Sequence, residues 1–339
     1  MSNELSMKFR RFAIHECSES SPLYEFLSLK IAEDAEMIQL ASSAQKGQPV
    51  PNLFFGAVHF LLLKGYKHTI TDFYPSITNH PGKAENAYPA FVDFCRRYSE
   101  EIIELLKSKI VQTNEVRRCS YLYPVFSQVF QMTKNPLALV EIGTSSGLQL
   151  FVDKYRYSYG PDKSFGNLDS EVHLRSEIRG DQSFLNPLPH FDVATRIGID
   201  LHINDVRNAE DYLWLKALIW PEHGERRELF ERAASYVSNQ TLNLIQGDGV
   251  ELLNSLVAEI PTDQTICIFH THVANQMPAK TKEKLLGQIK EIGNRRAIFH
   301  IYNNIYDAKL HFDYYLDGEE SLNPIGETEG HGRWFKLSL

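Results

Sequence analysis

The spacing of apolar residues divides the chain into two parts. In the first 130 residues or so, apolar side chains recur at intervals of three and four, the period of a helix that buries one side. Within AYPAFVDFCRRYSEEIIELLKSKI, for example, Phe91, Phe94, Tyr98 and Ile102 fall on one face. We therefore predict an N-terminal helical region over residues 1–125.

A different pattern begins near Leu137, where short apolar runs alternate with helical stretches. The expected strands are LALVEI, TRIGID, TLNLIQG, TICIFHT, RAIFHIY, HFDYYLD and RWFKLSL, and the expected helices start near Leu148, Asn208, Val250 and Ala279. This alternation predicts a doubly wound, mostly parallel α/β sheet over residues 126–339. No long helix separates the last two runs, which predicts an antiparallel hairpin at one sheet edge.

One connection in this part is unusually long. The chain between the first expected helix and TRIGID far exceeds an ordinary connection of about 2–6 residues. It contains EVHLRSEIRG, which has the pattern of an added strand. We interpret residues 157–194 as an insertion that shapes the substrate side.

The first expected strand leads directly into a loop of small residues. Gly143 and Gly147 bracket Thr144, Ser145 and Ser146. This spacing fits neither the Gly-x-Gly-x-x-Gly dinucleotide loop nor a phosphate-binding loop, which ends in Gly-Lys-Ser/Thr. In open parallel sheets ligands bind beyond the carboxyl ends of the strands, so the loop is a candidate ligand site. A tight strand–helix turn that holds no ligand is the alternative.

The stretch VEIGTSSG resembles the first motif of class I S-adenosylmethionine-dependent methyltransferases, in which an acid precedes two glycines separated by small residues. The resemblance implies a Rossmann-like methyltransferase sheet with S-adenosylmethionine as cofactor. It also implies that the methionine part of the cofactor is held by Glu141, Gly143, Thr144, Ser145 and Gly147. Ser145 stands where the family usually has a glycine.

The same resemblance assigns roles to residues after the next two strands. Asp200, at the end of ATRIGID, would accept both ribose hydroxyls, with Asp205 as the alternative. Gly247 and Asp248, in NLIQGDGVELL, match the element that lies near the adenine.

The fourth expected strand ends in histidines. His270 and His272 are two residues apart, so on a strand both point to one face, and His300 belongs to the expected neighbouring strand. Imidazole titrates near neutrality, so His270 or His272 is expected to orient or deprotonate a methyl acceptor. Zinc binding by the three histidines and a buried, hydrogen-bonded structural role are the alternatives. No acidic residue accompanies them in sequence, so we expect no metal.

A compact polar cluster precedes the glycine loop in KIVQTNEVRRCSYLYPVF. Gln112, Thr113, Asn114 and Glu115 are interpreted as a cap over the cofactor cleft or as a substrate contact. The alternative is that Thr113 or Asn114 caps a helix that starts at Glu115.

Several separate blocks resemble a bacterial family catalogued as domain of unknown function two-three-three-two. They are QTNEV, PNLFFGAVHFLLLKG, FYPS, GIDLHINDVRNAEDYLWLKALIWPE and FHTHV, and the resemblance covers nearly the whole chain. It implies a methyltransferase-like fold and cofactor class, and no particular reaction.

Charge and composition narrow the partners. The 339-residue chain has a formal net charge of −8, which argues against duplex DNA as a partner and leaves a structured RNA open. The most apolar run, from Leu53, is shorter than the about 20 residues needed to span a bilayer. Four cysteines stand far apart without a CxxC pair, which is typical of free thiols in the cytoplasm.

Together these features predict a cytoplasmic methyltransferase that acts on a small-molecule nucleophile, with the helical region covering the sheet. Two rivals remain at this level. One is a binding protein that kept the fold without the chemistry, and the other is a metal-dependent hydrolase that uses His270, His272 and His300.

Overall fold

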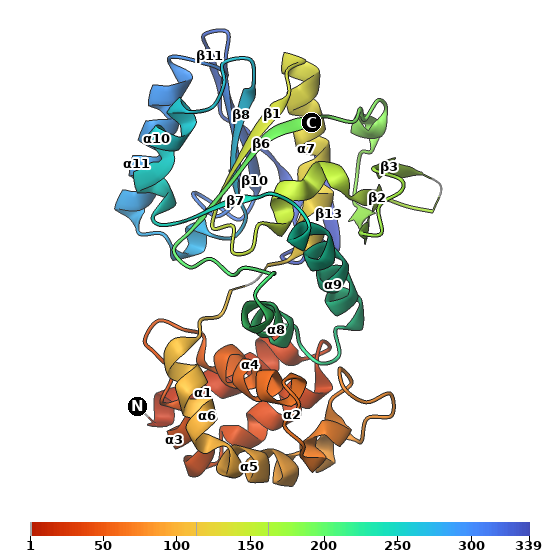
Figure 1. Ribbon diagram of the computed structural model, residues 1–339, viewed down its shortest axis with the longest axis vertical. Helices are drawn as coiled ribbons and strands as arrows, with labels where there is room; N and C mark the ends of the chain where they lie inside the picture. Colours follow the sequence, from red (N-terminus) through yellow and green to blue (C-terminus); the bar gives the residue numbers. More distant parts are fainter. Residues whose placement is uncertain (1, 113, 162) are drawn as a thin grey trace. The chain divides into compact units, whose positions relative to one another are not determined.

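A computed structural model describes residues 2–112, 114–161 and 163–339, and the chain forms two compact units (Figure 1). The first unit comprises Met1–Thr113 and Arg207–Glu228, and the second comprises Asn114–Val206 and Leu229–Leu339. The helical unit thus includes residues 207–228, which the apolar pattern placed in the α/β part.

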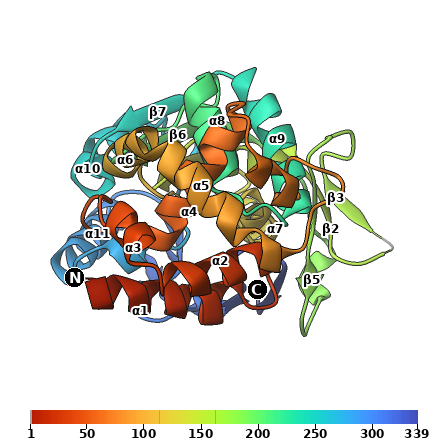
Figure 2. The same ribbon diagram turned by 90° about the horizontal axis from the view of Figure 1, so that it is seen from below.

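The first unit consists of helices around a common apolar core. Its helices are α1 (Ser2–Phe12), a π-helical turn (Ala13–Cys17), α2 (Pro22–Ile31), α3 (Ala35–Ala41), α4 (Val50–Leu63), α5 (Tyr88–Arg97), α6 (Ser99–Ser108), α8 (Ala209–Ala217) and the start of α9 (Gly224–Ser238). The buried α4 lies at their centre (Figure 2). Ser21 caps α2 by accepting a hydrogen bond from the Tyr24 N–H at 3.2 Å. No helix in the described part of the chain is long and apolar enough to cross a membrane.

Residues 207–228 belong to this unit because α8 carries part of its core. The Trp214 side chain is 2% exposed and packs in the same cluster as the aromatic residues of α4. Its indole N–H donates to the Ile110 carbonyl at 2.9 Å.

The second unit is an α/β fold around a mostly parallel central sheet. The parallel strands are β1 (Leu137–Ile142), β6 (Val193–Asp200), β7 (Asn243–Gln246), β8 (Thr265–His270) and β9 (Ile298–Tyr302). They lie in the order β7-β6-β1-β8-β9. Helices α10 (Gly249–Ala258) and α11 (Ala279–Gly293) pack on one face, and α7 (Cys119–Thr133) lies on the other, where Phe126 meets Phe269 edge-on (Figure 1).

The remaining strands extend this sheet beyond β9. They are β10 (Leu310–Leu316), β11 (Glu319–Ser321), β12 (Pro324–Thr328) and β13 (Trp334–Leu337), paired antiparallel. The expected hairpin between HFDYYLD and RWFKLSL is wrong, because β12 lies between these two strands. The short run PIGET gave no strand signal, since it begins with proline and has a glycine at its centre.

The insertion forms a small sheet of its own. Strands β2 (Arg156–Ser158), β3 (Ser164–Gly166) and β4 (His173–Arg175) pair in the order β3-β2-β4 (Figure 2). The one strand expected in EVHLRSEIRG is in fact two, because β4 is followed by β5 (Glu177–Ile178), which leaves the small sheet and pairs with β13.

The helix expected near Leu148 is not an α-helix. Residues Leu148–Lys154 form a 3₁₀ helix, η5, with a break at Phe151 (φ −100°, ψ 25°). Every residue from 148 to 153 is buried, so this segment has no solvent face of the kind that marks an amphipathic α-helix. The helices expected near Asn208, Val250 and Ala279 are present as α8, α10 and α11.

Candidate functional site

The glycine loop leaves β1 in an unusual backbone conformation. Gly143, Ser145 and Gly147 have φ values of 77°, 52° and 75°, in the region that L-amino acids seldom adopt. Ser145 thus adopts a left-handed conformation that glycine would favour, at a cost of roughly 1 kcal/mol.

Two neighbours hold Ser145 in this conformation. Its backbone N–H donates to Asp200 Oδ2 at 2.8 Å. Asn204 binds it twice, through its backbone N–H to the Ser145 carbonyl at 3.1 Å and through Nδ2 to Oγ at 3.2 Å. Asp200 Oδ1 accepts the His202 N–H at 3.1 Å, so the acid expected at the ribose is also a structural part of the loop.

Glu141 lies beneath the same loop and is 2% exposed. Thr144 donates its hydroxyl to Glu141 Oε2 at 2.6 Å, which ties the loop to β1. Burial raises the pKa of Glu141 to about 8, with a smaller contribution from the Asp200 charge and opposition from the Thr144 hydrogen bond. The carboxyl group therefore holds its proton more tightly in the folded protein than in the unfolded chain.

The raised pKa of Glu141 makes stability depend on pH. Between pH 4.5 and 8 the folded state binds more protons than the unfolded state, so wild-type stability should fall as pH rises. Glu141→Gln should remove this dependence. The new amide group must itself be buried. We therefore expect the substitution to raise the free energy of unfolding by only about 2 kcal/mol at pH 9 and to change it little at pH 5. Urea denaturation at both pH values measures the difference, and equal effects at the two pH values would contradict the assignment.

Protein side chains occupy the space beside both loop glycines. A Cβ at Gly143 would lie 2.2 Å from Val273 Cγ2, and one at Gly147 would lie 2.4 Å from Leu242 Cδ2. Packing and positive φ together account for both glycines. A ligand that passes over Gly143 therefore requires the turn that carries Val273 to move.

The end of β7 places Asp248 close to the same sheet edge. The Gly247 N–H donates to the Asp200 carbonyl at 2.9 Å, which joins the ends of β6 and β7. Asp248 caps α10, since its Oδ1 accepts the N–H groups of Val250 at 2.8 Å and Glu251 at 3.3 Å. The side chain is exposed, and its second oxygen is directed to no partner among the described residues.

The two histidines after β8 occupy different environments. The prediction that they share one strand face is wrong, because β8 ends at His270 and His272 lies in the next turn with φ 61°. His270 is fully buried, with Nε2 3.2 Å from His300 Nε2. The His272 N–H donates to Asn303 Oδ1 at 2.7 Å, and its ring Nδ1 lies 3.4 Å from Asn304 Nδ2.

Burial keeps both imidazoles neutral. It lowers the pKa of His270 to about 3 and that of His272 to about 4, and the nearby Arg118 charge adds to the effect at His272. Within residues 2–112, 114–161 and 163–339, no group of three or more His, Cys, Asp or Glu residues is placed to hold a metal ion.

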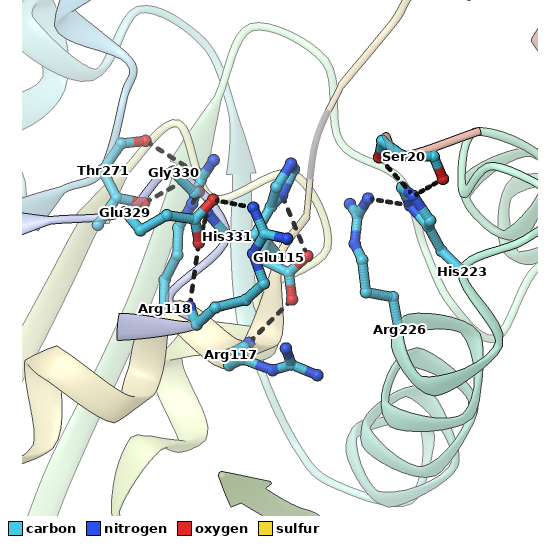
Figure 3. A network of polar contacts seen from close by, with 11 residues as sticks. Ser20, Glu115, Arg117, Arg118, His223, Arg226, Thr271, Glu329, Gly330 and His331 are labelled. Atoms are coloured by element: carbon cyan, nitrogen blue, oxygen red, sulfur yellow. Dashed lines mark hydrogen bonds and ion pairs between the residues drawn. The ribbon is translucent and has the colours of Figure 1, made fainter. Parts of the chain in front are cut away.

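A buried arginine links several segments near this edge (Figure 3). Arg118 donates from Nε to the Gly330 carbonyl at 2.9 Å and from Nη1 to Thr271 Oγ1 at 3.2 Å. Thr271 in turn donates to Gln149 Oε1 at 3.3 Å. Glu329 accepts the His331 N–H at 3.1 Å in the same network.

Sequence reasoning did not identify Gln149, Glu329 or His331. The tract TEGHGRW, with small and polar residues between two strands, was a usable signal for the last two. No local pattern marks Gln149, which stands within an apolar run.

The polar cluster before the loop is divided by the structure. Asn114 donates from Nδ2 to Ser146 Oγ at 2.5 Å, so it contacts the glycine loop. Glu115 caps the 3₁₀ turn Val116–Arg118 by accepting the Arg117 N–H at 3.2 Å, and its Oε2 lies 3.5 Å from His331 Nδ1. Gln112 belongs to the helical unit, and Thr113 lies outside the described residues.

Comparison with known proteins identifies a family. The model of a family described as uncharacterized protein conserved in bacteria (DUF2332) matches residues 6–337. No curated protein and no solved structure matches the chain. Because the match spans nearly the whole sequence, the chain belongs to this family of uncharacterized bacterial proteins.

Proposed function

We propose that the α/β unit binds S-adenosylmethionine and transfers its methyl group to a small-molecule nucleophile. The order of the parallel strands carries the proposal. In chain order, β7-β6-β1-β8-β9 is 3-2-1-4-5, the order of doubly wound sheets that bind nucleotides beyond their carboxyl ends. This order brings the glycine loop, Asp200 and Asp248 to one edge, after three adjacent strands.

The charge of these residues suits the cofactor. In the proposed complex the loop residues Gly143–Gly147, supported by Glu141, hold the methionine part. Asp200 binds the ribose while it keeps its hydrogen bond to the Ser145 N–H, and the second carboxylate oxygen of Asp248 contacts the adenine. The bound cofactor supplies an electrophilic methyl group on a sulfonium, a cation that the Asp200 carboxylate stabilises, whereas Glu141 is protonated below about pH 8 and acts through its hydrogen bond to Thr144.

His272 is the better candidate for the residue that orients the acceptor. Its Nε2 is buried and has no hydrogen-bond partner among the described residues. Because Asn304 Nδ2 donates to Nδ1, the neutral ring carries its proton on Nε2, which can donate it in a hydrogen bond to the acceptor. His270 is enclosed against His300, which favours a structural role. Alignment of the acceptor and exclusion of water are the main contributions expected of the remaining residues.

Calorimetry with S-adenosylhomocysteine tests the cofactor proposal. Wild-type protein should bind it, and Asp200→Asn should weaken binding about tenfold or more, since a carboxylate accepts stronger hydrogen bonds than an amide. Asp181→Asn is the matched control, because this exposed acid of the same unit only caps Ser183. Absence of binding to wild type, or equal binding by the Asp200 variant, would overturn the proposal.

The packing of Val273 against Gly143 also supports the alternative hypothesis that the protein binds a ligand without catalysing a reaction. Labelled S-adenosylmethionine, incubated with the protein and a small-molecule extract, separates the two. Transfer of label that His272→Gln abolishes supports the enzyme. Binding with no transferred label supports the rival.

A further inference from the structure

The inserted sheet β3-β2-β4 has one apolar and one polar face. Side chains alternate along a strand, so the buried Tyr157 and Leu174 point to one side. Arg156, Ser158, Ser164, His173 and Arg175 share the other side, because the register pairs Arg156 with His173 and Ser158 with both Arg175 and Ser164. These five residues are referred to below as the polar face.

This polar face lines a cavity of about 730 Å³, which Arg333 and Glu177 also border. Organic ligands of moderate size occupy pockets of roughly 300–1,000 Å³. The cavity therefore has room for more than a single inorganic ion.

The charges around the cavity are mainly positive and partly uncompensated. Arg333 pairs with Glu329 at 3.1 Å, and Glu177 is held by Arg179 through two contacts of 3.3 Å. Arg156 and Arg175 have no carboxylate partner within the described residues. Two uncompensated guanidinium groups are notable in a chain with a net charge of −8.

A chain of hydrogen bonds orients the hydroxyl groups between these cations. Arg156 Nη2 donates to Ser164 Oγ at 3.1 Å, and Ser164 Oγ lies 3.2 Å from Ser158 Oγ. Ser158 Oγ is 2.8 Å from His173 Nε2. Partial burial and the charges of Arg156 and Arg175 lower the pKa of His173, which places both cations near its ring.

From this arrangement we infer that the polar face binds a small organic molecule through a dianionic phosphate monoester group. Guanidinium forks and hydroxyl groups are the side chains that match phosphate oxygens. Two cations around linked hydroxyl groups suit a single group that carries about −1.5 to −2 charges at pH 7 better than they suit a dicarboxylate, whose two charges lie on separate groups. This site is separate from the residues proposed for S-adenosylmethionine, and its test does not depend on them.

Titration calorimetry with inorganic phosphate, glycerol 3-phosphate and malate tests the inference. Wild-type protein should bind glycerol 3-phosphate more tightly than phosphate, because the cavity accommodates the organic part, and malate should bind most weakly. Arg156→Gln and Arg175→Gln should each weaken glycerol 3-phosphate binding about tenfold or more.

Arg295→Gln is the matched control, since it removes the same charge from an exposed site just after α11, where Arg295 Nε donates to the Glu291 carbonyl. It should leave binding within about twofold of wild type. Glycerol 3-phosphate should also shift the His173 ring signals in nuclear magnetic resonance spectra. The inference is overturned if wild type binds none of the three probes, if malate binds as tightly as glycerol 3-phosphate, or if Arg295→Gln weakens binding as much as Arg175→Gln.

Discussion

Replacement of Gly143 by alanine should lower the free energy of unfolding by about 4 kcal/mol. Two costs add at this position. The left-handed backbone at φ 77° is strained for alanine. In addition, the alanine Cβ would lie 2.2 Å from Val273 Cγ2, so the loop or the 271–273 turn must shift. Urea denaturation followed by circular dichroism measures the loss.

Two further variants separate these costs. Gly318→Ala is the control for the backbone, since Gly318 has φ 84° in the same unit with nothing within 4 Å of an added Cβ, and we expect a loss of about 1 kcal/mol. Val273→Ala, combined with Gly143→Ala, should recover much of the steric cost. If Gly143→Ala and Gly318→Ala are equally destabilising, the contact with Val273 carries no energetic weight.

The same variants bear on the cofactor proposal. If Gly143 serves only the packing of Val273, the double variant should bind S-adenosylhomocysteine as wild type does. If the cofactor also passes close to Gly143, the added methyl group should weaken binding even after the fold has recovered, because it projects into the space of the ligand. The stability of these variants thus reports the packing role of Gly143, and their binding of S-adenosylhomocysteine reports whether the ligand passes close to it.

Apolar patterning was sufficient to locate the central strands. The runs LALVEI, TRIGID and TICIFHT became β1, β6 and β8. β1 and β8 are buried on both faces, and such strands need nearly continuous apolar sequences. Patterning failed at β12, whose pairing with β13 depends on the close approach of Gly326 to the Lys336 backbone. A contact of that kind leaves no periodic signal in either strand.

The candidate site was predictable where a residue follows a strand directly, and less so elsewhere. Asp200 and Asp248 lie at strand ends as expected. His272 does not share a face with His270, because its backbone adopts a left-handed conformation in the turn after β8. The hydrogen bond from its N–H to Asn303 Oδ1 stabilises that conformation, and the local sequence does not reveal this partner. Arg118 and Gly330 are brought together over 212 positions of sequence, a proximity that only the tertiary fold creates.

Replacement of Trp214 by alanine should destabilise the helical unit by about 4 kcal/mol. Its indole is 2% exposed, meets the Phe60 ring edge-on with 5.9 Å between centroids, and donates to the Ile110 carbonyl. The substitution creates a cavity and leaves that carbonyl without its donor. Hydrogen exchange should show lost protection of the amides of α4, while those of β1 and β8 keep theirs.

Trp220 provides the control within the same segment. It is only partly buried, and the hydrogen bond from its indole N–H to Asn52 Oδ1 is longer, at 3.3 Å. Trp220→Ala should therefore lower the free energy of unfolding about half as much as Trp214→Ala. Loss of protection in β1 and β8 rather than α4 would contradict the assignment of residues 207–228 to the helical core. In the sequence these residues follow directly after the Asp200 and Asn204 segment that holds the glycine loop.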